Sequence, residues 1–439
     1  MKKKTAKILK WIGNIILCIG VGLIILKVYG KYELGAAQDK LRAANYPMEL
    51  SKVLPKDVED KDNAAWVYSE LAYKLRNTTI NNSTIPEEID RLESDLNEAD
   101  VDQDIELKKE LEQEFAQLLN MPEIKSYGDI LQKARIKKYC QFDVALYLGY
   151  QTPMLHLSVI DDVTKFILAN IKHNIENINI WDQLSLYLNS ANALKSEVFT
   201  MSQGSRLNTF FSSKAIFDIK SLPPIRKKQY DDLILKLAEF RDAQPLITSL
   251  HAERLMCESD YFDGYIYSNR YFDFEGEHPL VKAIILANSM FIEFDHAVYL
   301  GAFEQLLSIF EQSYHVVDFS KEERYLTQHQ YALLSCYLLP PIYSNYEMLT
   351  RAKAHANVTE IGLACLYYRQ EKGVFPERIE QLDTDNIIDP FTGDNLIFKS
   401  TANSFTICSV GKNQKIDDVI EDNEYFNDND DTIWNYTNP

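Results

Sequence analysis

The sequence is poor in glycine, with 15 glycines in 439 residues, where roughly 7% is usual. Collagen, β-sandwiches and β-propellers need many glycines for close packing or tight turns, so this scarcity argues against them and favours long helices. Basic residues are scarce as well: 46 Lys and Arg stand against 65 Asp and Glu, and the net charge is −19. Phosphate backbones would repel such a chain, so we expect no nucleic-acid partner.

Familiar catalytic and metal-binding motifs are also missing. The chain contains no H-E-x-x-H, G-x-S-x-G, G-x-x-x-x-G-K, G-x-G-x-x-G or C-x-x-C pattern. The eight histidines form no close ligand pair, and the six cysteines are single and far apart. A disulfide between Cys336 and Cys365 is left as an alternative, but a complete disulfide framework does not fit these spacings. We therefore expect a non-enzymatic protein.

The first apolar segment is Trp11–Leu26, sixteen residues without a charge, flanked by Lys10 and Lys27. If both lysines direct their ammonium groups toward the membrane surface, the segment that can lie in the bilayer extends over residues 8–28. Such a helix is about 30 Å long, enough to cross the hydrocarbon core of a bilayer. The sequence thus predicts an N-terminal transmembrane helix, with the lipid bilayer as a partner of residues 8–28.

The distribution of lysines predicts the orientation of this helix. Five lysines precede the uncharged run and two follow it within residues 1–31, which favours a cytoplasmic N-terminus. A cleaved signal peptide is the alternative, but the small residues Gly35–Ala37 lie too far beyond the apolar run for normal cleavage. We expect a single-pass protein of the cytoplasmic (inner) membrane with most of the chain extracytoplasmic.

The middle of the chain has helical periodicity. After a linker at 32–56, we expect an irregular all-helical domain over 57–350. One helix should begin at Asp62-Asn63-Ala64-Ala65 and another at Thr84-Ile85-Pro86-Glu87-Glu88, which combines an N-cap, an early proline and acids in the first turn. Further helical stripes cover 123–149, 153–173, 181–201, 225–242, 245–259, 279–313 and 321–338, with breaks at Pro223-Pro224 and Pro340-Pro341.

An aromatic segment stands out within this domain. Seven aromatic residues lie between Tyr261 and Phe274, interleaved with acids. They form either a stacking surface for sugars or peptides or a plug that packs on the helical core. The tyrosines that would carry binding are Tyr261, Tyr265, Tyr267 and Tyr271.

The last ninety residues predict a small α+β domain over 351–439. A helix over Arg351–Lys372 should end at Gly373, a residue type typical of the position after a helix. Asp389-Pro390-Phe391-Thr392-Gly393 has turn composition. Strand-like runs at 396–399 and 404–410 predict a β-hairpin, and an acidic tail follows.

In this order, the C-terminal motifs resemble the globular domain of the major pseudopilins of type II secretion systems. The same tail is similar to the C-termini of uncharacterised membrane-anchored proteins of planctomycete-type bacteria. The resemblance covers about one fifth of the chain. It is carried by Leu366-Tyr367-Tyr368, Gly373-Val374-Phe375-Pro376, Asp389-Pro390-Phe391-Thr392-Gly393, Cys408-Ser409-Val410-Gly411-Lys412-Asn413 and the closing run Asp428–Trp434.

The resemblance implies a calcium site in the aspartate-rich loop near the C-terminus. Calcium takes six to eight oxygen ligands, which carboxylates supply well. The ligands implied are Asp417, Asp418, Asp428 and Asp430. The alternative is a solvated acidic terminus that binds no ion.

Together these features predict a mainly α protein: a transmembrane helix, a large helical domain and a small pseudopilin-like α+β domain. The function we expect is that of a structural or interaction protein of the bacterial cell envelope, associated with a secretion or pilus-like system as the resemblance implies. Two alternatives stay open: an envelope glycan or peptide hydrolase with an unmarked catalytic carboxylate, and a ligand-binding module that uses the Tyr261–Phe274 segment.

Overall fold

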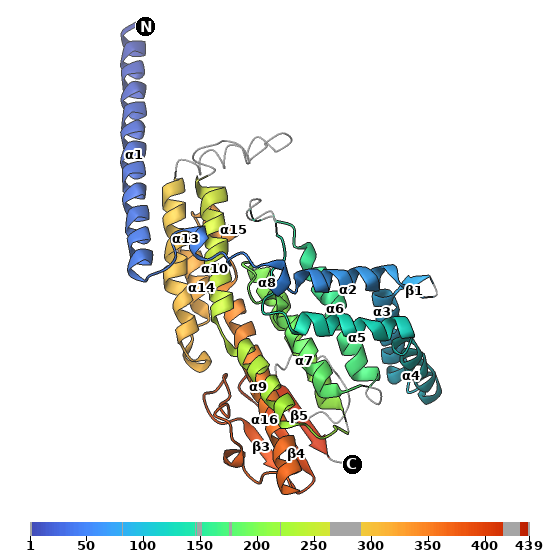
Figure 1. The fold of residues 1–439 in the computed structure, drawn as a ribbon. Coiled ribbons are helices and arrows are strands. Elements are labelled where there is room, and N and C mark those ends of the chain that lie inside the picture. Colours follow the sequence, from blue (N-terminus) through green and yellow to red (C-terminus); the bar gives the residue numbers. More distant parts are fainter. Residues whose placement is uncertain are drawn as a thin grey trace.

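The computed structural model describes residues 2–80, 82–144, 146, 152–174, 178–219, 221–263, 291–415 and 431–437, without the side chains of 2–10, 13 and 16. The chain is mainly helical, with a small antiparallel sheet near the C-terminus, as the sequence predicts. Figure 1 shows α1 beside α13 at one side, α2–α5 at the other, and β3–β5 at the end where the chain terminates.

The first helix, α1 (Lys2–Ala43), runs unbroken through the apolar run and into the predicted linker. Its C-terminal part packs on α13 (Ile292–Leu306). A Cβ at Gly30 would lie 2.8 Å from the ring of Phe294, so glycine permits this close approach. Leu41, one turn from the end of α1, is fully buried.

The predicted membrane anchor is contradicted by the structure. Among the residues that the structure describes, no helix combines the length and the apolar character needed to cross a membrane. The uncharged run Trp11–Leu26 makes about 24 Å of helix, which is shorter than a hydrocarbon core of about 30 Å, and its extension to residues 8–28 includes Lys10 and Lys27. The prediction of a single-pass protein of the cytoplasmic membrane is therefore wrong.

Four helices follow in succession: α2 (Ala65–Asn77), α3 (Ile85–Val101), α4 (Ile105–Leu119) and α5 (Pro122–Arg135). A two-residue hairpin of β1 (Thr79–Ile80) and β2 (Ser83–Thr84) separates α2 from α3. The predicted start at Thr84 is confirmed, because Thr84 and Glu87 form a reciprocal capping box.

The next helices are α6 (Leu155–His173), α7 (Ile180–Ala191), α8 (Thr200–Phe211), α9 (Lys227–Arg241), α10 (Gln244–Cys257), α14 (Ser320–Gln328) and α15 (Leu333–Leu338). The single helix predicted over 181–201 is wrong: the chain turns after α7 and starts α8. The helix predicted over 123–149 ends at Arg135. Short helical turns are η1 (Leu50–Lys52), η2 (Asp60–Asp62), η5 (Asn192–Leu194), η6 (Ser212–Asp218), η7 (Glu258–Asp263), η8 (Leu307–Glu311), η9 (Tyr314–Val316) and η10 (Ile379–Gln381).

The longest buried helix is α16 (Ile342–Lys372), which begins directly after Pro340-Pro341. It ends as predicted at Gly373, whose φ of 81° is a left-handed conformation that glycine adopts without strain. Most of its residues from Ile342 to Cys365 are buried. It packs against α8 and α9 on the helical side and against the C-terminal strands on the other.

The sheet has the order β3 (Ile397–Ser400), β4 (Ser404–Ser409) and β5 (Thr432–Thr437), all antiparallel. The pair β3–β4 is the predicted hairpin. The third strand was not predicted, because its alternation of buried Trp434 and Tyr436 follows directly on an acidic run. Trp434 stacks on Phe217 of η6 with ring centroids 4.6 Å apart, which joins the strand to the helical body.

The turn Asp389–Gly393 forms as predicted. Its Asp389 carboxylate is buried and accepts hydrogen bonds from Phe391 N, Ser409 Oγ and Val410 N at 2.9–3.0 Å. Gly393 has a φ of 79° and faces the ring of His315. The carboxylate therefore fixes the turn to the end of β4. All six cysteines are free, so Cys336 and Cys365 form no bridge.

The contact between Trp434 and Gly362 of α16 gives a stability prediction. A Cβ at Gly362 would lie 1.9 Å from the Trp434 ring, so Gly362→Ala must displace a fully buried indole. We expect this variant to lose roughly 1–3 kcal/mol of unfolding free energy in urea denaturation, as overpacked cores do.

Gly128→Ala in α5 is the matched control, because no atom lies within 4 Å of its added Cβ. This half-buried helical position should gain up to about 1 kcal/mol from helix propensity. Equal effects of the two substitutions would contradict the packing of Trp434 on α16.

Candidate functional site

Most of the predicted site residues lie outside the described residues. This holds for the calcium ligands Asp417, Asp418, Asp428 and Asp430, and for Tyr265, Tyr267 and Tyr271. Within the part of the chain that the structure describes, no group of three or more His, Cys, Asp or Glu side chains is placed to hold a metal ion. The calcium site stays a prediction.

Tyr261 is the one predicted tyrosine that can be placed. It lies in η7, partly buried against the hydrophobic cluster around α13. Its neighbour Phe262 is fully buried and stacks on His296 at 4.4 Å. At these two positions the aromatic segment packs on the core, as the structural alternative expects.

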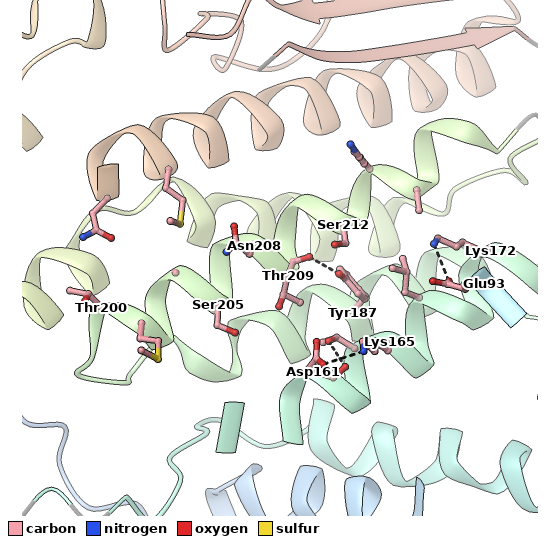
Figure 2. Close-up of a pocket in the computed structure, with 18 of the residues that line it drawn as sticks. Glu93, Asp161, Lys165, Lys172, Tyr187, Thr200, Ser205, Asn208, Thr209 and Ser212 are labelled. Atoms are coloured by element: carbon pink, nitrogen blue, oxygen red, sulfur yellow. Dashed lines mark hydrogen bonds and ion pairs between the residues drawn. The ribbon is translucent and has the colours of Figure 1, made fainter. Parts of the chain in front are cut away.

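A cavity of about 970 Å³ lies along α8 and is bordered by α6, η6 and the start of α16. We call it the α8 cleft. Figure 2 shows Ser205, Asn208, Thr209 and Ser212 one after another along α8 and the start of η6, and all four line the cleft. Tyr187 closes its floor and donates a hydrogen bond to the Thr209 carbonyl oxygen at 2.5 Å.

The charges of the α8 cleft compensate one another. Three lysines and three acids line it. Lys172 Nζ lies 3.0 Å from Glu93, and Lys165 Nζ lies between Asp90 and Asp161 at 3.2 and 3.5 Å. The cleft therefore offers hydroxyl and amide groups but little net charge to a ligand.

A second concavity, the basic groove, consists of two adjoining cavities of about 620 and 600 Å³. The two share Val53, Gln244 and Thr248 in their linings. The segment between α1 and α2, blue in Figure 1, forms one side, and α10 forms another. Six basic side chains line the groove: Arg42, Lys52, Lys137, Lys138, Lys195 and Lys236. The three acids that line it are Glu197, Glu239 and Asp242.

Asn63 holds the segment that forms one wall of the groove. Its Nδ2 donates to the carbonyl oxygen of Gln141 at 2.8 Å, and its Oδ1 accepts from Gln141 N at 2.9 Å and Ala65 N at 3.1 Å. The backbone of Tyr139 also pairs with Asp62 and Ala64. The helix start that the sequence singled out therefore holds the 137–141 segment, which carries two of the lysines.

Three groove lysines form no ion pair with a carboxylate of the described residues. Lys137 Nζ donates to the Lys61 carbonyl oxygen and lies 5.7 Å from the ring centre of Trp66. Lys138 Nζ lies 4.9 Å from the ring centre of Tyr139. Lys52 is the third. Lys195 and Lys236 are paired with Glu239 at 3.2 Å and Asp232 at 3.5 Å. The positive charge of an ammonium group that forms no ion pair attracts an anion.

Glu197 lies in the groove lining with its side chain almost completely buried. Burial raises the pKa of Glu197 to about 7, although a hydrogen bond from Phe142 N lowers it. Behind it, His156 Nε2 is 3.5 Å from Glu197 Oε2, and burial lowers the pKa of His156 to about 4. The imidazole is therefore neutral near pH 7, and Glu197 exchanges its proton in that range.

Sequence reasoning missed both the groove and Glu197. One signal for the groove exists: residues 133–138 contain four basic residues and no acid in an otherwise acidic chain. Glu197 has no comparable signal, since nothing around it distinguishes it from the other acids of the chain. Its burial arises only when α7, η5 and the segment before α6 pack together.

Glu197 should make stability depend on pH. The folded protein binds this proton more tightly than the unfolded chain, so the contribution of Glu197 to stability falls as pH rises from about 4.5 to 7. A shift from 4.5 to about 7 corresponds to about 3 kcal/mol. We expect Glu197→Gln to exceed the natural protein in unfolding free energy by up to that amount at pH 8, but by under about 1 kcal/mol at pH 5. Urea denaturation at the two pH values measures this difference.

Glu239→Gln provides the control, because the Glu239 side chain is 42% exposed and only ion-paired with Lys195. We expect a change below about 1 kcal/mol at both pH values. A pH-independent difference between Glu197→Gln and the natural protein would show that the Glu197 carboxyl is not desolvated.

Comparison of the chain with known protein families, with curated proteins and with solved structures finds no match. The resemblance of residues 351–439 to major pseudopilins therefore stays a prediction. What can be said of function rests on the two concavities and the side chains that line them.

Proposed function

We propose that this chain is a non-enzymatic interaction protein that binds an acidic ligand in the basic groove. The observation that carries the proposal is a set of three lysines around one concavity of an acidic chain, Lys52, Lys137 and Lys138, which form no ion pair with a carboxylate of the described residues. Like charges gathered at one place repel one another, and a bound anion removes that repulsion.

The charge of the groove contrasts with that of the chain. Six basic against three acidic side chains line it, whereas acids outnumber bases in the whole sequence by 19. Below pH 7 the proton on Glu197 removes one of the three negative charges. The α8 cleft lacks this excess, because its lysines are matched by acids. The groove is therefore the better site for a charged ligand.

A hydrolase that cleaves such a ligand is the second candidate. Glu197 favours it, because a carboxyl with a pKa of about 7 in a concavity suits a general acid. Glycoside hydrolysis commonly uses a second carboxylate. The other two acids of the groove are already engaged, Glu239 with Lys195 and Asp242 with Gln244 N at 2.9 Å. For this reason we favour binding over catalysis.

Removal of the lysine pair tests the binding proposal. We expect Lys137→Gln/Lys138→Gln to weaken binding of acidic hexamers at least tenfold, because two cations at the groove mouth are lost. The measurement is isothermal titration calorimetry at pH 6 and 50 mM NaCl with two probes, hexagalacturonate and hexaglutamate. Affinity should fall further at 300 mM NaCl, since salt screens exposed charges.

Lys133→Gln is the matched control, because Lys133 lies in the same basic run on α5 but outside the groove lining. It should leave the affinity within twofold. If neither probe binds the natural protein, or if the control variant weakens binding as much as the double variant, the proposal fails. If the natural protein releases new reducing ends from hexagalacturonate and Glu197→Gln does not, the function is that of a hydrolase and the binding proposal is replaced.

A further inference from the structure

We infer that the ligand of the basic groove is an acidic glycan, an oligosaccharide whose sugar rings bear carboxylates. The inference rests on the proposed function and adds the chemical class of the ligand. Its basis is the pairing of each groove-mouth lysine with an exposed aromatic ring.

The two rings belong to Tyr139, which lines the groove, and Trp66, which lies next to the groove lysine Lys137; they are 46% and 47% exposed. Lys137 Nζ lies over the Trp66 ring and Lys138 Nζ over the Tyr139 ring. A pyranose ring has a face of C–H groups that packs on an aromatic ring, and a uronic acid carries its carboxylate at the edge of the same ring. One such sugar therefore fits a neighbouring aromatic ring and ammonium group together.

The chain holds the Trp66 ring and the backbone of Tyr139 in place before any ligand arrives. Trp66 Nε1 donates to the Asp60 carbonyl oxygen at 3.3 Å. Tyr139 is fixed through its backbone, which accepts from Ala64 N at 2.8 Å and donates to the Asp62 carbonyl oxygen at 3.1 Å. Fixed exposed rings lose little conformational freedom when a sugar packs on them.

The same hydrogen bonds argue against an acidic peptide. An extended peptide that adds to an exposed strand needs free N–H and C=O groups along that strand. In the 139–141 segment, the N–H and C=O of Tyr139 and of Gln141 already have partners on the helix start. A peptide would find lysines at the groove mouth but no backbone edge there.

Amide and hydroxyl groups also line the groove. Asn189, Asn192, Gln244 and Thr248 are among its lining residues. Side-chain amides both donate and accept hydrogen bonds, which suits the hydroxyl groups of a sugar. The groove thus combines ring faces, cations and amides, the three kinds of group that an acidic sugar uses.

The test compares hexagalacturonate, hexaglutamate and the neutral maltohexaose by calorimetry on the full chain at pH 6. We expect hexagalacturonate to bind at least tenfold tighter than either of the others. Trp66→Ala/Tyr139→Ala should weaken hexagalacturonate at least tenfold and hexaglutamate less than twofold, because only the sugar uses the rings.

Tyr73→Ala is the control for the aromatic variants, since Tyr73 lies on the same helix α2 and is 69% exposed, but is not one of the two rings over which Lys137 and Lys138 lie. It should leave all affinities unchanged, and circular dichroism melts should show that each variant folds. Hexaglutamate binding as tightly as hexagalacturonate overturns the glycan inference and leaves the proposed function standing. Failure of both acidic probes to bind overturns the proposed function itself.

Discussion

The burial of α16 is the constraint on which the rest of the structure depends. Residues from Ala352 to Cys365 belong to the hydrophobic cluster that contains α2–α9 and the sheet, while Ile342–Leu349 and Ala354 belong to the cluster around α10 and α13. A helix that is buried on all sides needs other elements packed against every face. The helical body and the C-terminal strands therefore share one core along α16.

Polar side chains on α16 fix how its partners dock. Glu360 is buried, and its carboxylate binds Arg241 of α9 at 2.5 Å and the amide of Asn386 at 3.0 Å. His355 is 2% exposed and shares a 2.9 Å hydrogen bond with Ser213, while burial lowers its pKa to about 3. Buried polar groups without partners cost free energy. These pairs therefore favour the observed arrangement of the elements around α16 over arrangements in which the same groups would lose their partners.

What the sequence allowed us to predict is local. The capping box of Thr84 and the left-handed Gly373 depend on residues a few positions apart, and both form as expected. The wall of the basic groove instead joins Asn63 to Gln141, 78 positions along the chain, and no local pattern reports such a pairing. The third strand was missed for a related reason, because its partner β4 lies beyond the acidic run.

The apolar run of α1 shows the limit of a purely compositional argument. Its hydropathy and flanking lysines are typical of an anchor, yet its uncharged part falls short of a bilayer's thickness and the same helix continues onto α13. Composition indicates that a segment is apolar enough to be buried. Whether it is buried in a bilayer or against the rest of the protein depends on the length of the uncharged stretch and on its tertiary contacts. The Asp62–Ala65 helix start is the converse case, since it starts α2 as its local pattern predicts and also holds a distant segment that no local pattern indicates.

The position of Glu197 bears on how the groove uses its lysines. Burial raises its pKa and the hydrogen bond from Phe142 N lowers it, and no lysine of the groove is among the causes of the shift. Had Lys137 or Lys138 faced this carboxyl, their charge would have lowered its pKa. The ammonium groups are thus not used to stabilise the internal acid. They lie instead beside the exposed rings of Trp66 and Tyr139, where a ligand from solution can reach them.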